Sequence, residues 1–350
     1  MRLGGTLSSA RIAYETWGRL NDRADNAILI LTGLSPSAHA ASSPDDPEPG
    51  WWEDMVGPGK ALDTERFFLV CANSLGSCKG STGPASRDPE TGQPYRLDFP
   101  MLTLEDVANS AREVVRQLGI GKLHALVGPS MGGMSALAYA VMHPGEARHL
   151  VLISCAAHAT PFAIALRSLQ RELIRSDPSW EGGAYPLDRE PVDGMKLARK
   201  LGMITYRSAA EWLERFGRDR VPDDRRGPGP FPMEFQIESY LQHHADRFTG
   251  GFDANSYLYL SHAMDLFDIA AHGDGVEGAL ARVRAERVLV IGVETDLLFP
   301  LWQQRELARG LEAAGPAVSF QALPSLQGHD SFLVDTERFG EVVGGFLRET

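Results

Sequence analysis

Short, continuously apolar segments set the strongest limit on the folds open to this chain. Each has five to eight residues, and they lie far apart in the sequence: Ala27–Leu34, Phe67–Ala72, Leu123–Gly128, Leu150–Ser154 and Arg287–Val293. Uninterrupted apolar runs of this length are typical of strands that are buried on both faces of a parallel sheet. Residues Arg11–Gly18 alternate in part, as a half-exposed antiparallel strand would, and Val318–Leu323 is a weaker candidate strand.

Helical patterns separate these segments. The clearest places apolar side chains on one stripe of Thr103–Leu118 and ends at Gly119, and three more stretches follow: Met134–Met142, Leu301–Leu311 and Thr336–Leu347. An amphipathic stripe followed by glycine is typical of a helix packed on a core. The alternation of strands and helices predicts an α/β fold with a mostly parallel central sheet.

One interval breaks this alternation. The roughly 130 residues between Ser154 and Arg287 contain no convincing strand, which is far more than a strand connection needs. We interpret this interval as a helical cap inserted between two strands of the sheet. The predicted division is a core of residues 1–156 and 285–350, and a cap of residues 157–284.

Charge and composition exclude several classes of function. The 46 acidic against 34 basic side chains leave a net charge of −12, whereas general nucleic-acid or anionic-membrane binding needs a basic surface. The chain has no apolar run near the ~18 residues of a membrane span, and its first residues lack the apolar core of a signal peptide. Three cysteines cannot form a disulfide framework. We therefore expect a cytoplasmic protein that binds neither nucleic acid nor membranes.

The motif Gly128-Pro129-Ser130-Met131-Gly132-Gly133 carries the sharpest chemical signal. It follows a predicted strand and opens a predicted helix, which is the context of a nucleophile elbow. In so tight a turn, the residues two before and two after the serine need minimal side chains, and both are glycine. The elbow would lift the Ser130 hydroxyl to the top of the sheet and direct the Met131 amide toward a developing oxyanion. The alternative is a glycine loop whose serine only caps the helix.

A serine nucleophile needs a base and a carboxylate that orients it, in the order Ser, Asp, His along a chain of this fold. Asp296 follows the predicted strand Arg287–Val293, and His329 follows the last predicted strand. We predict that these two complete a catalytic triad, although His329 alone could be a surface loop histidine. The second oxyanion amide would come from Leu34, just past the end of an early strand.

Other candidate sites are weaker. The glycine-rich loop Asn73–Pro84 lacks the order of residues that a nucleotide-binding P-loop requires. His243, His244 and Asp246 are close in sequence, but consecutive histidines face different sides of a helix, so we predict no metal site. Cys155 ends an apolar strand, where a structural role is expected.

Several motifs together resemble the homoserine O-acetyltransferase family of α/β-hydrolase-fold acyltransferases. The similarity covers nearly the whole chain and includes, in order, Leu31–Gly33, Gly50–Trp52, Asn73–Pro84, Gly128–Met134, Ser176–Trp180, Ala198-Arg199, Ile204–Ser208 and Gly328–Asp330. The resemblance implies a ping-pong reaction in which an acyl-CoA acylates Ser130, CoA leaves, and the hydroxyl of a small amino acid takes the acyl group. Succinyl-CoA or acetyl-CoA would be the co-substrate, and no permanently bound cofactor is expected.

The resemblance also assigns further residues. Ser130 is the nucleophile, His329 the base and Asp296 its orienting acid, while the amides of Leu34 and Met131 form the oxyanion hole. Arg199 and Tyr206 match the contacts to the acceptor's carboxylate, and Asp330 matches the partner of its ammonium group. A homodimer is expected on the resemblance alone.

The chain departs from the acetylating branch in a way that bears on substrate choice. Pro129 stands in the elbow where glycine is usual, and further differences occur at Asn109-Ser110, Ser135–Ala140 and Ser154–Ala159. These features are more similar to the serine O-succinyltransferase branch, which acts in cysteine biosynthesis. A succinyl carboxylate would need a cation, for which the chain offers Lys79, Arg87, Arg167 or Arg171. The alternatives are an L-homoserine O-acetyltransferase or O-succinyltransferase of methionine biosynthesis and, from another class, an esterase or a ligand-binding protein.

Overall fold

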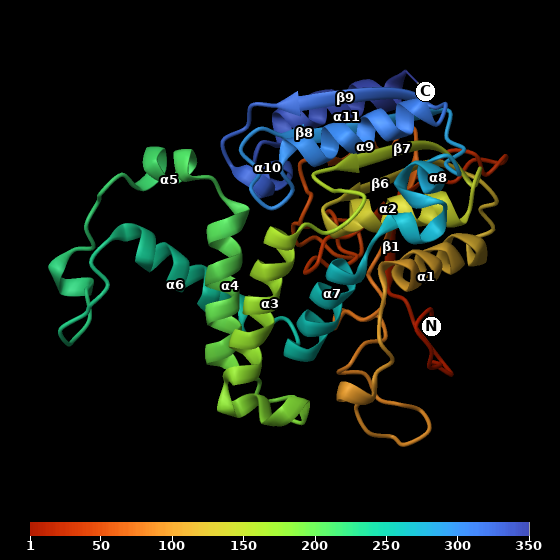
Figure 1. The fold of residues 1–350 in the computed structure, drawn as a ribbon. Coiled ribbons are helices and arrows are strands. Elements are labelled where there is room, and N and C mark those ends of the chain that lie inside the picture. The colour runs from red at the N-terminus through yellow and green to blue at the C-terminus, as the bar shows by residue number, and fades with distance from the viewer. Residues whose placement is uncertain (350) are drawn as a thin grey trace.

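The computed structural model describes residues 1–349 and shows a seven-stranded sheet with the order β1-β5-β2-β6-β7-β8-β9 (Figure 1). Only β1 runs antiparallel to its neighbour; the other pairs are parallel. The strands are β1 (Tyr14–Trp17), β2 (Ala27–Leu31), β5 (Phe68–Ala72), β6 (Leu123–Pro129), β7 (Ala147–Ile153), β8 (Arg287–Val293) and β9 (Ala317–Leu323). The predicted α/β fold with a mostly parallel sheet is confirmed, and each predicted strand is present.

Helices cover both faces of the sheet. On one face lie α1 (Leu104–Gln117), α2 (Met131–Met142) and α9 (Leu301–Ala313), and α11 (Thr336–Arg348) lies on the other. A hydrophobic core lies on each face of the sheet, and successive residues of the central strands point alternately into one core and the other. Leu29 packs toward α1 and α2, whereas Ile28 and Ile30 pack toward α11. This alternation explains why the strands read as unbroken apolar runs. A short sheet of β3 (Val56–Gly57) and β4 (Leu62–Asp63) extends the second face.

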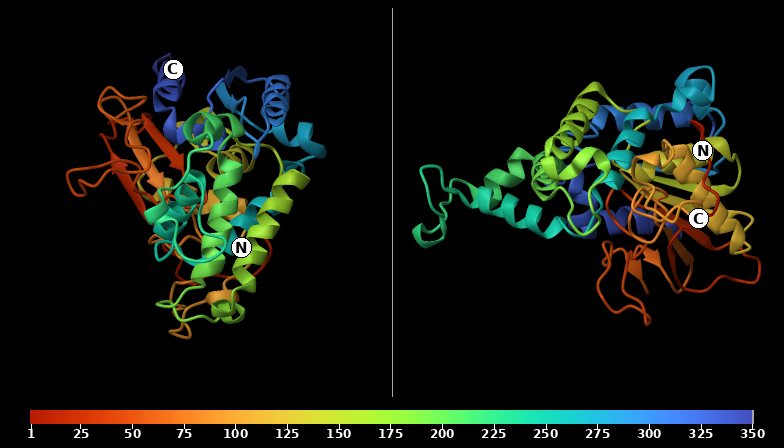
Figure 2. Two further views of the ribbon diagram at one scale, coloured as in Figure 1. Left: turned by 90° about the vertical axis from the view of Figure 1, so that its left-hand side faces the viewer. Right: turned by 90° about the horizontal axis from the view of Figure 1, so that it is seen from below.

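The interval between β7 and β8 is helical, as expected. It contains α3 (Pro161–Ser176), α4 (Val192–Tyr206), α5 (Ala209–Phe216), α6 (Gln236–Phe248), α7 (Ala254–Leu266) and α8 (Gly275–Leu280). The helices α3 and α4 pack side by side beside the carboxyl edge of the sheet, and the segment around α5 and the start of α6 projects away from the rest of the molecule (Figures 1 and 2). A four-residue helix, α10 (Ser331–Val334), precedes α11.

The packing of the residues before β8 bears on the extent of the predicted cap, residues 157–284. An isolated bridge pairs His158 with Asp268, at the point where the chain leaves and re-enters the core. Beyond it, the turn Ile269–His272 packs on α2, and α8 packs on α9. Because both partners belong to the core layer, we propose that the cap comprises about residues 158–268.

Candidate active site

The turn between β6 and α2 has the geometry of a strained elbow. Ser130 connects Pro129 to Met131 with φ 56° and ψ −125°, a backbone conformation that non-glycine residues rarely adopt. A Cβ added to Gly128 would come within 2.2 Å of the Gly132 carbonyl oxygen, and one on Gly132 would come within 2.0 Å of the Leu31 carbonyl oxygen. Only glycine fits at either position, so the glycine spacing read in the sequence has a steric cause.

Ser130, His329 and Asp296 form one continuous chain of hydrogen bonds. The Ser130 Oγ lies 2.8 Å from His329 Nε2, and His329 Nδ1 lies 2.8 Å from Asp296 Oδ2. The side chains of His329 and Asp296 are 5% and 0% exposed. Because Nδ1 faces a carboxylate, the imidazole donates there and offers Nε2 as an acceptor for the serine proton. The fold thus brings His329 into contact with Ser130, 199 positions earlier, and with Asp296, 33 positions earlier.

Backbone amides and aromatic rings hold the acid and the histidine in place. Asp296 Oδ1 accepts hydrogen bonds from the amides of Leu298 and Phe299, both at 2.9 Å. The Phe299 ring stacks on the His329 ring with centroids 5.1 Å apart, and Phe332 meets the same ring edge-on at 5.6 Å. The carboxylate and the imidazole therefore have little freedom to turn away from Ser130.

The end of β2 lies against the elbow. An added Gly132 Cβ would also approach the Thr32 carbonyl oxygen to 3.0 Å, which places the start of α2 directly beside this strand end. Leu34 follows two residues later and lines the same cavity as Ser130. Met131 is the first residue of α2, where helix amides have no partner within the helix. The roles of both amides as oxyanion donors stay a prediction.

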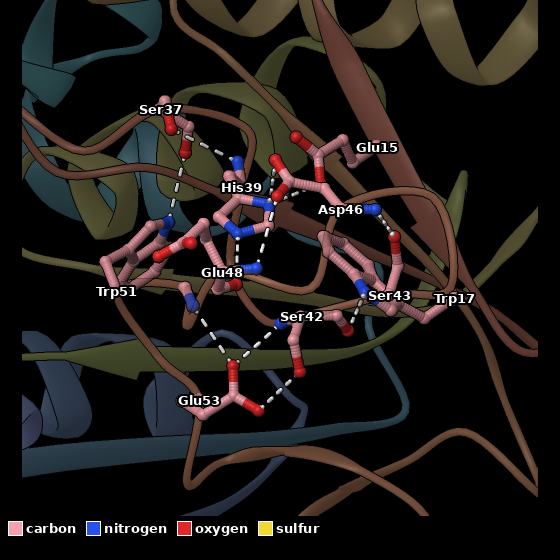
Figure 3. A network of polar contacts seen from close by, with 11 residues as sticks. Glu15, Trp17, Ser37, His39, Ser42, Ser43, Asp46, Glu48, Trp51 and Glu53 are labelled. Atoms are coloured by element: carbon pink, nitrogen blue, oxygen red, sulfur yellow. Dashed lines mark hydrogen bonds and ion pairs between the residues drawn. The ribbon is translucent and has the colours of Figure 1, made fainter.

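The loop that follows Leu34 is held by a polar network around His39 (Figure 3). His39 Nδ1 lies 2.9 Å from the Glu15 carboxylate, and Nε2 lies 2.8 Å from the Glu48 carbonyl oxygen. Both partners only accept hydrogen bonds, so the ring makes both contacts as an imidazolium ion. Burial opposes this state, but the contacts with Glu15 and Glu48 raise the pKa of His39 above its ordinary value. In the same loop, the Trp51 indole donates to the Ser37 carbonyl at 3.0 Å.

A cavity of about 130 Å³ lies above Ser130, between the core and the cap. Trp51 and Leu34 line it from the core, and Arg199 and Tyr206 line it from α4. Ser130 itself is only 8% exposed at the bottom of this cavity. Its burial limits the access of water to the serine.

The three predicted acceptor-binding residues all line this cavity. The Arg199 guanidinium lies 4.7 Å from the centre of the Phe248 ring, and its buried Nε has no hydrogen-bond partner within residues 1–349. Burial raises the pKa of the Tyr206 hydroxyl, which keeps it protonated and able to donate. Their assignment to the acceptor stays a prediction.

Asp330 has a partner that residue spacing did not indicate. Arg207 Nε lies 3.2 Å from Asp330 Oδ2, and Arg207 Nη1 also lies 2.6 Å from Glu211. Burial raises the pKa of Asp330, whereas Arg207, His329 and Arg199 act to lower it. An ammonium group in the cavity would therefore meet a carboxylate that is already paired on one oxygen.

Other sequence candidates lie away from the cavity or offer no chemistry. Burial raises the pKa of the Cys155 thiol, whose Cβ and Sγ pack where a Gly133 side chain would lie. His243 and His244 meet edge to face on α6, and residues 1–349 contain no group of three His, Cys, Asp or Glu side chains that could hold a metal ion. No helix in that range is long and apolar enough to cross a membrane.

Comparison with known proteins places the chain among enzymes that transfer or hydrolyse acyl groups. A model of the alpha/beta hydrolase fold family matches residues 26–336. A serine O-succinyltransferase of Litchfieldella anticariensis is 61% identical over 348 residues, covering 99% of this chain and 95% of that protein. An L-serine/homoserine O-acetyltransferase of Streptomyces lavendulae is 61% identical over 354 residues, covering 99% and 94%.

Solved structures show the same similarity. The crystal structure of homoserine O-acetyltransferase from Bacillus anthracis superposes with a TM-score of 0.87 at 32% identity, covering 96% of this chain and 91% of that one. The esterase E22 superposes with a TM-score of 0.86 at 30% identity, covering 97% and 94%. Chains of this shape therefore include both transferases and an esterase.

Proposed function

This chain belongs to the α/β-hydrolase fold family and is an acyltransferase within it, and from that premise we propose that it carries a succinyl group from succinyl-CoA to the side-chain hydroxyl of L-serine. The observation that carries the proposal is the 2.8 Å contact between Ser130 Oγ and His329 Nε2, made by a buried serine beneath a cavity lined by Arg199 and Asp330. A buried nucleophile beside one cation and one anion suits transfer to a zwitterion better than transfer to water.

In the first half-reaction, Ser130 Oγ attacks the thioester carbonyl while His329 Nε2 takes its proton. The negative charge that develops on the carbonyl oxygen meets the amides of Met131 and Leu34. The C–S bond then breaks, His329 returns the proton to the CoA sulfur, and the acyl group remains as an ester on Ser130. Asp296 keeps the imidazole in the tautomer that this proton transfer needs.

In the second half-reaction, the amino-acid hydroxyl attacks the acyl-serine ester. His329 takes the hydroxyl proton and returns it to Ser130 Oγ as the ester bond breaks. Arg199 and Tyr206 bind the carboxylate of the acceptor, and Asp330 binds its ammonium group. These contacts orient the attacking oxygen, which is the contribution expected of groups that hold a substrate in place.

The choice of substrates rests on the branch features Pro129 and Ser135 and on the names of the similar proteins. Several relatives at 57–61% identity are named serine O-succinyltransferase, whereas the Streptomyces lavendulae relative at 61% is named for acetyl transfer to serine and homoserine. Acetyl transfer to L-homoserine is therefore the second candidate. We also infer a cytoplasmic homodimer without a resident metal or cofactor, serving cysteine biosynthesis.

The test is a matrix of succinyl-CoA and acetyl-CoA against L-serine and L-homoserine, followed by the release of free CoA thiol. We expect the highest kcat/KM for succinyl-CoA with serine. A higher value for acetyl-CoA with homoserine would overturn the branch assignment. Intact-mass spectrometry without acceptor should show a succinyl adduct that Ser130→Ala abolishes, and an adduct that persists in this variant would refute Ser130 as the nucleophile.

A further inference from the structure

The helix α3 runs between two cavities and presents a different arginine to each. Arg167 lines the cavity above Ser130, and Arg171, one turn later, lines a separate cavity with Arg175 and His262. Both arginines pair with Asp265 of α7, through Arg167 Nε at 2.5 Å and Arg171 Nη2 at 2.7 Å. One carboxylate therefore serves two guanidinium groups.

This cluster has an excess of buried positive charge. The side chains of Arg167 and Asp265 are 5% and 7% exposed. Arg167 uses only Nε in its ion pair, and Nη1 and Nη2 are buried without a hydrogen-bond partner within residues 1–349. Unpartnered donors on a buried cation are costly, so this end of the guanidinium is complementary to an anion.

Arg167 lines the cavity from a helix that is anchored to its neighbour. Its own helix packs along α4, where Gln170 Nε2 donates to the Ala198 carbonyl at 3.0 Å. Gln170 lines the same cavity and is itself 4% exposed. Nε is tied to Asp265 and α3 is anchored to α4, so the two terminal nitrogens remain as a fork whose geometry matches both oxygens of a carboxylate.

The charges of the proposed substrates match the charged residues of the cavity. The amino-acid acceptor brings one carboxylate and one ammonium group, for which Arg199 and Asp330 are present. A succinyl group brings a second carboxylate, at the end of the acyl chain remote from the ester. Among the four cations considered from the sequence, only Arg167 lines the cavity that contains Ser130. Arg171 faces the other cavity, and Arg87 donates to the Gly92 carbonyl on an exposed loop.

We propose that Nη1 and Nη2 of Arg167 bind the distal carboxylate of the succinyl donor and make Arg167 the residue that selects succinyl-CoA over uncharged acyl-CoAs. This inference rests on the proposed acyl transfer from acyl-CoA to Ser130. An acetyl group has no distal carboxylate, so with acetyl-CoA as donor Nη1 and Nη2 of Arg167 stay unpaired.

The first test needs no variant. Butyryl-CoA has the same four-carbon chain as succinyl-CoA but ends in a methyl group, so the two donors differ at the group that Arg167 would bind. Wild-type enzyme with L-serine should prefer succinyl-CoA by about 10²-fold or more in kcat/KM, because the uncharged donor leaves buried polar groups unpaired. Equal use of the two donors would overturn the inference.

The second test compares Arg167→Met with Arg171→Met, which also removes a partner of Asp265 but changes the other cavity. Arg167→Met should lower kcat/KM for succinyl-CoA about 10²-fold and leave butyryl-CoA and acetyl-CoA within a few-fold, whereas Arg171→Met should leave the ratio of donors unchanged. Arg167→Lys keeps the charge without the fork and should retain part of the preference. Thermal melting of each variant reports its folding.

The outcomes separate the two proposals. Wild-type enzyme without activity on any acyl-CoA would refute the proposed function itself. Activity that falls equally with all donors in Arg167→Met would mean that the residue only supports the fold, and a raised KM for serine with unchanged donor selection would mean that it binds the acceptor. Either result would overturn the role of Arg167 while leaving acyl transfer intact.

Discussion

Replacing Asp296 by asparagine tests how the catalytic histidine is oriented. Asp296 Oδ1 accepts from the amides of Leu298 and Phe299 at 2.9 Å, and Oδ2 faces His329 Nδ1 at 2.8 Å. In Asp296→Asn, the amide oxygen must stay with the two backbone donors, since the NH₂ group cannot accept from them. The NH₂ group therefore points at His329 Nδ1.

This orientation imposes the wrong tautomer on the imidazole. His329 Nδ1 now accepts, so the ring proton moves to Nε2, which then donates toward Ser130 instead of accepting its proton. A catalytic triad altered in this way loses about 10⁴-fold in kcat. At about 1.36 kcal/mol for each factor of ten, the expected loss of transition-state stabilisation is about 5.4 kcal/mol. The side chain of Asp296 is fully buried, so water cannot readily replace the missing acceptor.

Rapid-quench measurement of CoA release, with intact-mass detection of the acyl-enzyme, isolates the step affected. We expect both half-reactions to slow by a similar factor, because His329 moves a proton in each. Thermal melting should change little, since the hydrogen bonds from Leu298 and Phe299 are preserved; Asp296→Ala, which loses them, should be less stable. An Asp296→Asn enzyme that keeps more than a tenth of wild-type turnover would refute the reasoning.

Three further outcomes are expected. Arg199→Leu should slow transfer to the acceptor by about 10²-fold or more while leaving acyl-enzyme formation within a few-fold; equal slowing of CoA release in the absence of acceptor would contradict an acceptor role. Gly132→Ala forces a Cβ to within 2.0 Å of the Leu31 carbonyl oxygen, so denaturant titrations should show a free energy of unfolding lower by about 1–3 kcal/mol or more. The control Gly345→Ala on α11 has open space around the added Cβ and should be neutral or stabilising. His39→Asn should reduce stability most below about pH 6.5 and progressively less as the pH rises through the raised folded-state pKa of His39, because the imidazolium contacts contribute fully only below the unfolded pKa; a difference in Tm between wild type and variant that grows with pH would argue against them.

The sheet and the elbow were predictable because their determinants are local. A strand buried on both faces must be apolar throughout, and the turn at Ser130 admits only glycine at two positions where a Cβ would meet backbone atoms. Asp296 and His329 could be placed because parallel strands end at the same edge of a sheet. The end that we propose for the cap, in contrast, rests on contacts of Ile269–His272 with α2 that no local pattern indicates.

No sequence pattern indicates the polar network around His39. Its ring joins Glu15, 24 residues earlier, to a carbonyl nine residues later, and both acceptors come to it only through the fold. The sequence supplied a histidine among acidic residues. Folding the loop against β1 brings an acceptor to each ring nitrogen and thereby raises the pKa of that histidine.

The sequence by itself indicated the elbow at Ser130 and the loops that carry Asp296 and His329, because backbone sterics fix the glycines of the turn and each loop directly follows an apolar strand. Tertiary structure decided how the charges pair around the cavity. Asp330 pairs with Arg207, and Arg167, rather than Arg171 one turn away, lines the cavity that contains Ser130. Long side chains reach several partners, and which one they meet depends on the rotation and packing of α3, α4 and α7, which the order of residues along the chain does not specify.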